Sequence, residues 1–192
     1  MNRNPEKVLI VAPRIWKSDK NYNYSIEELS LLIDTLGLKV CGVIEQKLNR
    51  INPAYFIGSG KAKQIVEQAK LLKANYIVFD EDLSPVQTKN FQKLEEKIKF
   101  IDRSGVILEI FFNNAKSKES KTQVELARLQ YQLPRLTRMW THLERQMGGF
   151  GTRAGAGETQ IEVDRRILRK RISNLKKKLK GIDSERRVQS KK

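Results

Sequence analysis

Apolar positions in the N-terminal half of the chain alternate between strand-like and helix-like spacing. Short apolar runs of strand length are VLIVAP (8–13), KVCGVIEQ (39–46) and YIVFDE (76–81). Helical spacing follows each of them, in SIEELSLLIDTLG, KAKQIVEQAKLLKAN and SPVQTKNFQKLEEK, and KFIDRSGVILEIFFNNA begins a last strand and helix. Strands that alternate with helices predict an α/β fold with a mainly parallel, twisted sheet over residues 1–118.

Punctuating residues predict where the first of these helices begins and ends. Ser25 is a candidate N-cap, because Glu28 follows it three residues later as in a capping box. Gly37 is a candidate stop, because glycine readily adopts the left-handed conformation that ends many helices. The first helix is therefore expected between these two residues.

The hydrophobic period changes at Lys121 to an unbroken spacing of three and four residues. This seam predicts two heptad helices in a long antiparallel helical hairpin, a coiled-coil arm over residues 119–182. Pro134 lies inside the first helix, where proline removes a backbone hydrogen bond. Because the seam continues through it in register, we expect a kink there rather than the start of a fresh helix. The seam positions are Leu126, Leu129, Leu133, Leu136, Trp140, Leu143 and Met147, then Leu168, Ile172, Leu175, Leu179 and Ile182.

The stretch GGFGTRAGAGETQ (148–160) holds five of the eleven glycines, with a predicted hairpin tip at 148–158. It has two interpretations, a cradle for nucleotide phosphate or a tip that contacts RNA. A Walker A loop needs G-x-x-x-x-G-K-[ST], and this stretch has no lysine. The only Gly-Lys pair, in YFIGSGKAKQI, has Tyr55 in place of the first glycine and Ala62 in place of the hydroxyl residue. The phosphate-cradle interpretation therefore fails.

Other catalytic signatures are equally weak. DRSG (102–105) fits the D-x-x-G pattern of GTPases, but no P-loop precedes it and no N-K-x-D motif occurs. His142 is the only histidine and Cys41 the only cysteine, so neither has the partners that catalysis or a metal site requires. We predict no catalytic residue, no metal site and no cofactor for this chain.

A second glycine-containing turn opens a predicted helix. Helix N-termini attract anions, so this turn is a candidate anion-binding site. The alternative is a tight strand-to-helix turn with no ligand. Its residues are Gly58, Ser59, Gly60 and Lys61.

Charge changes this picture, because the net charge of +16 is uneven. Residues 121–192 carry 19 Lys/Arg against 7 Asp/Glu, whereas residues 1–120 carry 19 against 15. A basic C-terminal part of the chain predicts a polyanionic partner. The end of the chain, residues 183–192, is expected to be a disordered basic linker or tail. With no apolar run of membrane-spanning length and no signal peptide at the N-terminus, we expect a cytoplasmic protein.

The hairpin tip combines the residue types that suit structured RNA. Arginine donates a planar fork to phosphate and stacks on bases, and Phe150 offers a stacking surface. Glycines allow close backbone approach. The alternative is a mobile linker between two helices, which has less need of arginine and phenylalanine between its glycines. The arginines flanking and within the tip are Arg138, Arg145, Arg153, Arg165 and Arg166.

The run TQVELARLQYQLPRLTRMWTHLERQMGGFGTRAGAGETQIEVDRR (122–166) strongly resembles the HflX family of ribosome-associated GTPases. DRSGVILEIFFNNAKSKESK and YFIGSGKAKQI are similar to the N-terminal domain of that family, so the resemblance spans essentially the whole chain. It implies an α/β subdomain and a helical hairpin followed by a G domain, to which GTP and Mg²⁺ would belong.

The resemblance also implies a partner. Family members bind the large (50S) ribosomal subunit, split or rescue ribosomes, and place the hairpin tip near the peptidyl transferase centre. We therefore expect a monomeric protein that contacts 23S rRNA. The implied RNA-binding residues are Arg138, Arg145, Gly148, Gly149, Phe150, Gly151, Thr152, Arg153, Gly155, Gly157, Gln160, Arg165 and Arg166.

Two departures from the family pattern stand out. The usual tip is similar to GGxGTRGPGETQ, whereas this one is longer by one residue and has no proline. The chain also stops where the G domain is expected to begin, which fits either a truncated chain or a natural protein without the domain. Two other interpretations remain open: GTP binding and hydrolysis by a longer protein, and a coiled-coil interaction module without RNA binding.

Overall fold

The computed structural model describes residues 5–15, 22–136 and 160–189, which fall into two compact units, Met1–Ile110 and Phe111–Lys192. The first unit is an α/β fold. Its elements in chain order are β1 (Lys7–Ile15), α1 (Tyr22–Thr35), β2 (Lys39–Leu48), α2 (Ser59–Leu71), β3 (Tyr76–Phe79), α3 (Pro85–Leu94) and β4 (Lys99–Asp102). Helix α4 (Arg103–Asn114) begins in the first unit and ends in the second.

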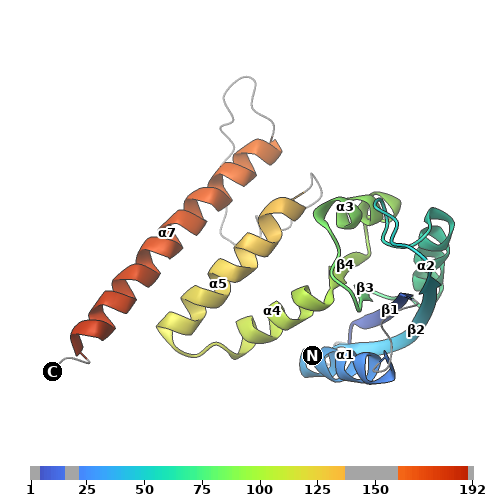
Figure 1. Ribbon diagram of the computed structural model, residues 1–192, viewed down its shortest axis with the longest axis horizontal. Coiled ribbons are helices and arrows are strands. Elements are labelled where there is room, and N and C mark those ends of the chain that lie inside the picture. Colours follow the sequence, from blue (N-terminus) through green and yellow to red (C-terminus); the bar gives the residue numbers. More distant parts are fainter. Residues whose placement is uncertain (1–4, 16–21, 137–159, 190–192) are drawn as a thin grey trace. The chain divides into compact units, whose positions relative to one another are not determined.

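The four strands form one parallel sheet in the order β2-β1-β3-β4 (Figure 1). The pairing of β1 with β2 shifts register between Val8 and Leu9, so that Leu9 lies opposite Gly42. A Cβ added at Gly42 would meet Leu9 Cδ1 at 3.2 Å and Leu72 Cδ1 at 3.3 Å, so this position favours glycine by space. The sheet confirms the α/β fold with parallel strands that the sequence predicted.

The two faces of the sheet bury two separate hydrophobic cores. Val8 and Ile10 of β1 pack with Leu29 and Ile33 of α1 and with Val106 of α4. The alternate residues of the same strand pack against α2 and α3 on the opposite face. This period of two explains why every residue of the run VLIVA is apolar, since a central parallel strand is covered on both sides. The second core includes Leu9, Val11, Ile65, Phe79 and Phe91.

The ends of the helices agree only partly with the sequence signals. Gly37 has a φ of 73° and donates its N–H to the Asp34 carbonyl at 2.9 Å, which confirms it as the stop after α1. The prediction that Ser25 caps this helix was wrong, because α1 begins at Tyr22. Ser25 instead donates its hydroxyl to Asp80 at the sheet edge. A capping box does occur at Ser84 and Gln87, at the start of α3.

The second unit pairs α5 (Lys118–Gln132) with α7 (Gln160–Gln189). Leu129 and Leu136 pack with Leu168, Ile172 and Leu175, and each of these side chains is at most 9% exposed. Leu126 and Leu133 lie against the same cluster. The structure therefore confirms this stretch of the seam. Trp140, Leu143 and Met147 lie outside the described residues.

The predicted kink at Pro134 was wrong. Helix α5 ends at Gln132, a 3-10 turn covers Leu133–Arg135, and Leu136 has a ψ of 123°, which is not helical. Pro134 occupies a first-turn position of this 3-10 segment, where its missing N–H is no loss. Leu133, the residue before the proline, keeps helical angles (φ −51°, ψ −48°), so the α-helix passes into the 3-10 turn and the backbone leaves the helical conformation at Leu136.

Helix α7 is longer than the sequence suggested. We expected a linker or tail from residue 183, but the backbone remains helical as far as Gln189. A helix with such a basic surface is stabilised chiefly by its packed face, here the contacts of Leu168, Ile172 and Leu175 with α5.

Candidate nucleic-acid interface

The predicted RNA-binding tip lies largely outside the described residues. That applies to Arg138, Arg145 and every predicted residue from Gly148 to Gly157, including Phe150 and Arg153. Their role in binding RNA stays a prediction. Of the predicted set, the structure describes the start of α7: Gln160 is its first residue, and Arg165 and Arg166 lie within its second turn.

Arg165 and Arg166 differ in exposure. Arg165 is half-buried and Arg166 is exposed. The pattern follows from helical geometry, because Arg165 precedes the buried Leu168 by three residues and so lies beside the seam. Arg166 lies about 160° around the helix axis from Leu168, on the side away from the seam.

Beyond these two, α7 carries many basic residues that were not singled out from the sequence. Between residues 160 and 182 the helix has nine Lys/Arg and two Asp/Glu. All of these basic residues except Arg165 are exposed. The sequence already shows these lysines and arginines between the seam positions. They were not singled out because most surface helices have a polar face.

Some cations of the hairpin do have protein partners. Arg171 donates its Nε to Glu125 of α5 at 2.7 Å, which joins the two helices beside the seam. The guanidinium carbon of Arg135 lies 3.8 Å from the centre of the Tyr131 ring, and that of Arg128 lies 4.4 Å from the centre of the Phe112 ring. These contacts are all within the second unit.

The turn at residues 58–61 forms the N-terminus of α2, as predicted. Gly58 is the N-cap, with no side chain hydrogen-bonded to the first-turn amides. Gly58, Ser59 and Gly60 are exposed, and a Cβ at either glycine would meet nothing within 4 Å. Neither glycine has a positive φ. The geometry is compatible with an anion and equally with an unliganded turn, so anion binding here stays a prediction.

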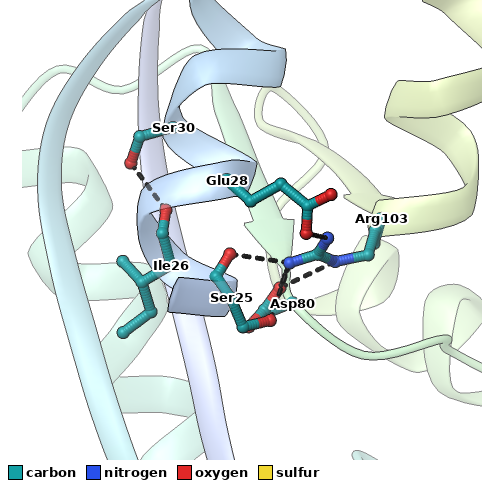
Figure 2. Close-up of polar contacts among 6 residues, drawn as sticks. All are labelled: Ser25, Ile26, Glu28, Ser30, Asp80 and Arg103. Atoms are coloured by element: carbon teal, nitrogen blue, oxygen red, sulfur yellow. Dashed lines mark hydrogen bonds and ion pairs between the residues drawn. The ribbon is translucent and has the colours of Figure 1, made fainter. Parts of the chain in front are cut away.

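A polar cluster that sequence reasoning missed lies at the carboxyl edge of the sheet (Figure 2). Arg103, the first residue of α4, donates its Nε to Asp80 at 2.9 Å and a terminal nitrogen to the same oxygen at 2.6 Å. Its other nitrogen donates to Glu28 at 2.7 Å. Ser25 accepts from Arg103 through its carbonyl and its hydroxyl, each at 2.7 Å. We call this arrangement the Arg103 clasp.

The Arg103 clasp is closed. Burial opposes the charge of Arg103, but the hydrogen bonds to Asp80 and Glu28 outweigh it, so the pKa of the guanidinium is raised. Nε and both terminal nitrogens have protein acceptors, which leaves little donor capacity for a ligand. The clasp is therefore a structural connection of α1, β3 and α4.

The same edge explains the D-x-x-G match. Asp102, the last residue of β4, is 1% exposed and accepts the N–H groups of Gly105 and Leu83 at 2.9 and 3.1 Å. Its carboxylate therefore caps α4 and fixes the loop before α3. Asp102 of DRSG thus has a structural role here.

Two further findings concern only the described parts of the chain. No three His, Cys, Asp or Glu side chains there are grouped closely enough to hold a metal ion. No described helix combines the length and the apolar character that crossing a membrane requires.

Comparison with protein families gives the class of protein. Residues 23–112 match the family described as GTP-binding GTPase N-terminal, and residues 114–192 match GTP-binding GTPase Middle Region. The boundary between the two matches lies close to the boundary between the compact units. The α/β unit and the hairpin are thus two regions of one class of GTPase.

Curated relatives give the particular family. The chain is 44% identical over 187 residues to GTPase HflX of Flavobacterium psychrophilum, covering 97% of this chain and 45% of that protein. It is 44% identical to GTPase HflX of Escherichia coli, covering 84% of this chain and 37% of that one. The chain belongs to the HflX family. It spans less than half the length of these relatives.

Solved structures support the fold alone. A GTP-binding protein from the archaeon Sulfolobus solfataricus, in complex with GDP, aligns over 93% of this chain and 46% of its own, with a TM-score of 0.61 and 22% identity. The structure described as the SsGBP and GDP complex aligns over 95% of this chain and 46% of its own, with a TM-score of 0.66 and 24% identity.

Proposed function

We propose that this chain is the ribosome-binding region of an HflX-type GTPase. It docks on the large (50S) subunit and inserts its hairpin tip into 23S rRNA near the peptidyl transferase centre, in ribosome splitting, rescue or biogenesis. The observation that carries this proposal is the hairpin itself: its apolar residues are used between α5 and α7, and its outward surface is cationic.

The buried seam weighs against the coiled-coil alternative. An oligomerisation helix keeps its apolar positions for another chain, whereas Leu129 and Leu168 are only 4% and 5% exposed within a single chain. What the described hairpin offers to a partner is charge. A surface of exposed lysine and arginine favours a phosphate backbone.

GTP binding and hydrolysis are the second candidate function, for the whole protein rather than for these residues. The relatives are named as GTPases and are more than twice as long as this chain. The sequence of this chain has no Walker A motif. GTP turnover by these 192 residues alone would contradict this division of roles.

Binding to purified large subunits tests the proposal. We expect Arg153→Ala to weaken co-sedimentation about tenfold, since a charge-assisted hydrogen bond to phosphate contributes roughly 1.5–3 kcal/mol. Arg50→Ala is the matched control, because it removes the same charge from an exposed loop of the first unit.

Salt adds a second readout to the same experiment. Phosphate contacts release counterions, so binding by the unaltered chain should weaken by tenfold or more between about 50 and 200 mM salt. Failure to associate with large subunits at low salt, or equal losses for Arg153→Ala and Arg50→Ala, would contradict the proposal.

A further inference from the structure

Between residues 169 and 180 of α7, five basic residues occupy one side of the helix. Successive residues of an α-helix turn by about 100°, so these five fall about 80–200° around the axis from Leu168. The buried residues Ile172 and Leu175 lie within about 40° of Leu168, so the arc of the five is centred about 140° away from Leu168, with Lys176 at its near edge. All five are exposed. We call them the α7 stripe: Arg169, Lys170, Lys176, Lys177 and Lys180.

The α7 stripe is a surface of uncompensated charge. Arg171, which lies outside the stripe, bridges from α7 to α5 by pairing with Glu125. Within the described residues, none of the five stripe side chains makes an ion pair. Between Lys170 and Lys177, the exposed Ser173 shares the side of the stripe, and no carboxylate interrupts it.

We propose that the α7 stripe binds the phosphate backbone of double-helical RNA. Residues 169–180 span about 17 Å of helix axis. Arg169 and Lys170 form one group of cations, and Lys176, Lys177 and Lys180 form a second group about two turns further along the helix. Two groups of cations on one side of a helix suit a backbone that carries regularly spaced charges. This inference rests on the proposed function and divides it into two surfaces, the α7 stripe and the tip.

The residue types of α7 favour double-stranded RNA over single-stranded RNA as the ligand. Proteins that bind unpaired RNA interleave cations with aromatic side chains on which bases stack. Residues 160–189 contain no Phe, Tyr or Trp, whereas the tip contains Phe150. A surface with cations and no stacking platform contacts the outside of a helix, where bases are already paired.

The same chemistry disfavours other partners. An amphipathic helix that lies on a membrane needs an apolar face for the lipid, and the apolar face of α7 is used against α5. Protein interfaces depend on buried aromatic or aliphatic anchors, and the α7 stripe has none. Ile167 is 44% exposed but lies on a different side of α7 from the stripe.

The test is an equilibrium titration of the 192-residue chain against two labelled probes, an RNA duplex of about 20 base pairs and an oligouridine of the same length, in a salt series. The stripe variant is Lys170→Gln/Lys177→Gln. The control variant is Lys121→Gln/Lys178→Gln, which removes two exposed lysines outside the stripe. Glutamine resembles lysine in helix propensity, so the circular dichroism of α7 should not change.

We expect the unaltered chain to bind the duplex more tightly than oligouridine. The stripe variant should lower the slope of log K against log salt for the duplex by about two, and weaken binding on the order of tenfold near ~100 mM salt. The control variant should leave the slope unchanged. Equal losses in both variants would show diffuse attraction, and tighter binding of oligouridine would indicate a single-strand site. Either result, or an acidic protein competing as well as RNA, overturns the proposal.

Large subunits separate this inference from the proposed function. Arg153→Ala should weaken binding to subunits and leave duplex binding nearly unchanged. If the unaltered chain binds subunits but the stripe variant binds the duplex as well as the control variant does, the proposal for the α7 stripe alone is refuted. Absence of subunit binding by the unaltered chain would instead refute the proposed function, whatever the duplex result.

Discussion

Arg103 connects three elements that are distant in sequence. Its guanidinium reaches Asp80, 23 residues earlier, and Ser25, 78 residues earlier. The Asp80 side chain is 7% exposed and the Glu28 side chain 66%. Since exposed ion pairs contribute little and buried ones are costly to break, the contact with Asp80 dominates the energetics of the Arg103 clasp.

Arg103→Met is expected to lower the free energy of unfolding by about 3 kcal/mol, because it leaves the buried Asp80 carboxylate without its cation. Glu28→Gln, which alters only the exposed partner, should cost less than about 1 kcal/mol. Urea unfolding with an unchanged m-value measures both. Similar small losses in the two variants would mean that water solvates Asp80 in place of Arg103.

At the residue scale, the sequence predicted helix ends correctly where neighbouring residues determine them, and wrongly where a residue distant in sequence takes part. Gly37 was predictable, because a helix stop depends on its own φ. Ser25 resembled an N-cap by its spacing from Glu28, yet both residues are recruited by Arg103 from another region of the chain. Nothing in the local sequence distinguishes those two uses of a serine.

At the element scale, the seam between α5 and α7 is the main apolar contact among the described residues of the second unit. Leu168 is 5% exposed and packs in the cluster with Leu129 and Ile172, whereas its neighbour Ile167 is 44% exposed. Two adjacent aliphatic residues on one helix thus differ mainly in whether they face α5.

Leu168→Ala should destabilise the hairpin by roughly 2–4 kcal/mol, through lost transfer free energy and the cavity left behind. Ile167→Ala removes a similar side chain from an exposed position and should cost no more than about 1 kcal/mol. Thermal unfolding followed by the helical signal compares the two. Equal effects would show that the seam does not hold α5 to α7.

The hairpin also shows what periodicity can and cannot predict. Three-four spacing correctly placed Leu129, Leu168, Ile172 and Leu175 in one cluster. It could not locate the end of α5, since Leu136 stays in contact with the cluster after the backbone has left the helix. Apolar residues can keep their spacing and their contacts where the backbone is no longer helical, so an unbroken apolar pattern does not guarantee an unbroken helix.

At the scale of the whole molecule, the chain divides its stability and its charge between two units. The first has two cores around a sheet, and the described residues of the second have the single seam. Most of the excess positive charge belongs to the sequence of the second unit. The hydrophobic pattern predicts two parts as well, with a boundary at residue 118, because its period changes near that point.

The candidate interface was predictable only as a region. The basic bias of residues 121–192 pointed to a polyanion, but the α7 stripe emerged once the buried side of α7 was known. The sequence gives the number of charged residues, but only the packing of α7 shows which of them share one exposed side of the helix.

Substitutions in the two units should act independently. Because the core around α1 and the seam have no described residue in common, we expect Arg103→Met to raise amide hydrogen exchange in α1 and β3, and Leu168→Ala to raise it in α5 and α7. Hydrogen exchange followed by mass spectrometry resolves these segments. Acceleration of β1 by Leu168→Ala would show that the units unfold as one.

The strand order has a consequence for how the sheet assembles during synthesis. Of the four strands, β1 leaves the ribosome first and ends in the interior of the sheet, with β2 on one side and β3 then β4 on the other. Every later strand therefore adds to an edge that is still open, and no pair of strands has to separate to admit another. A nascent chain can build this sheet outward from β1, without undoing any pairing that it has already made.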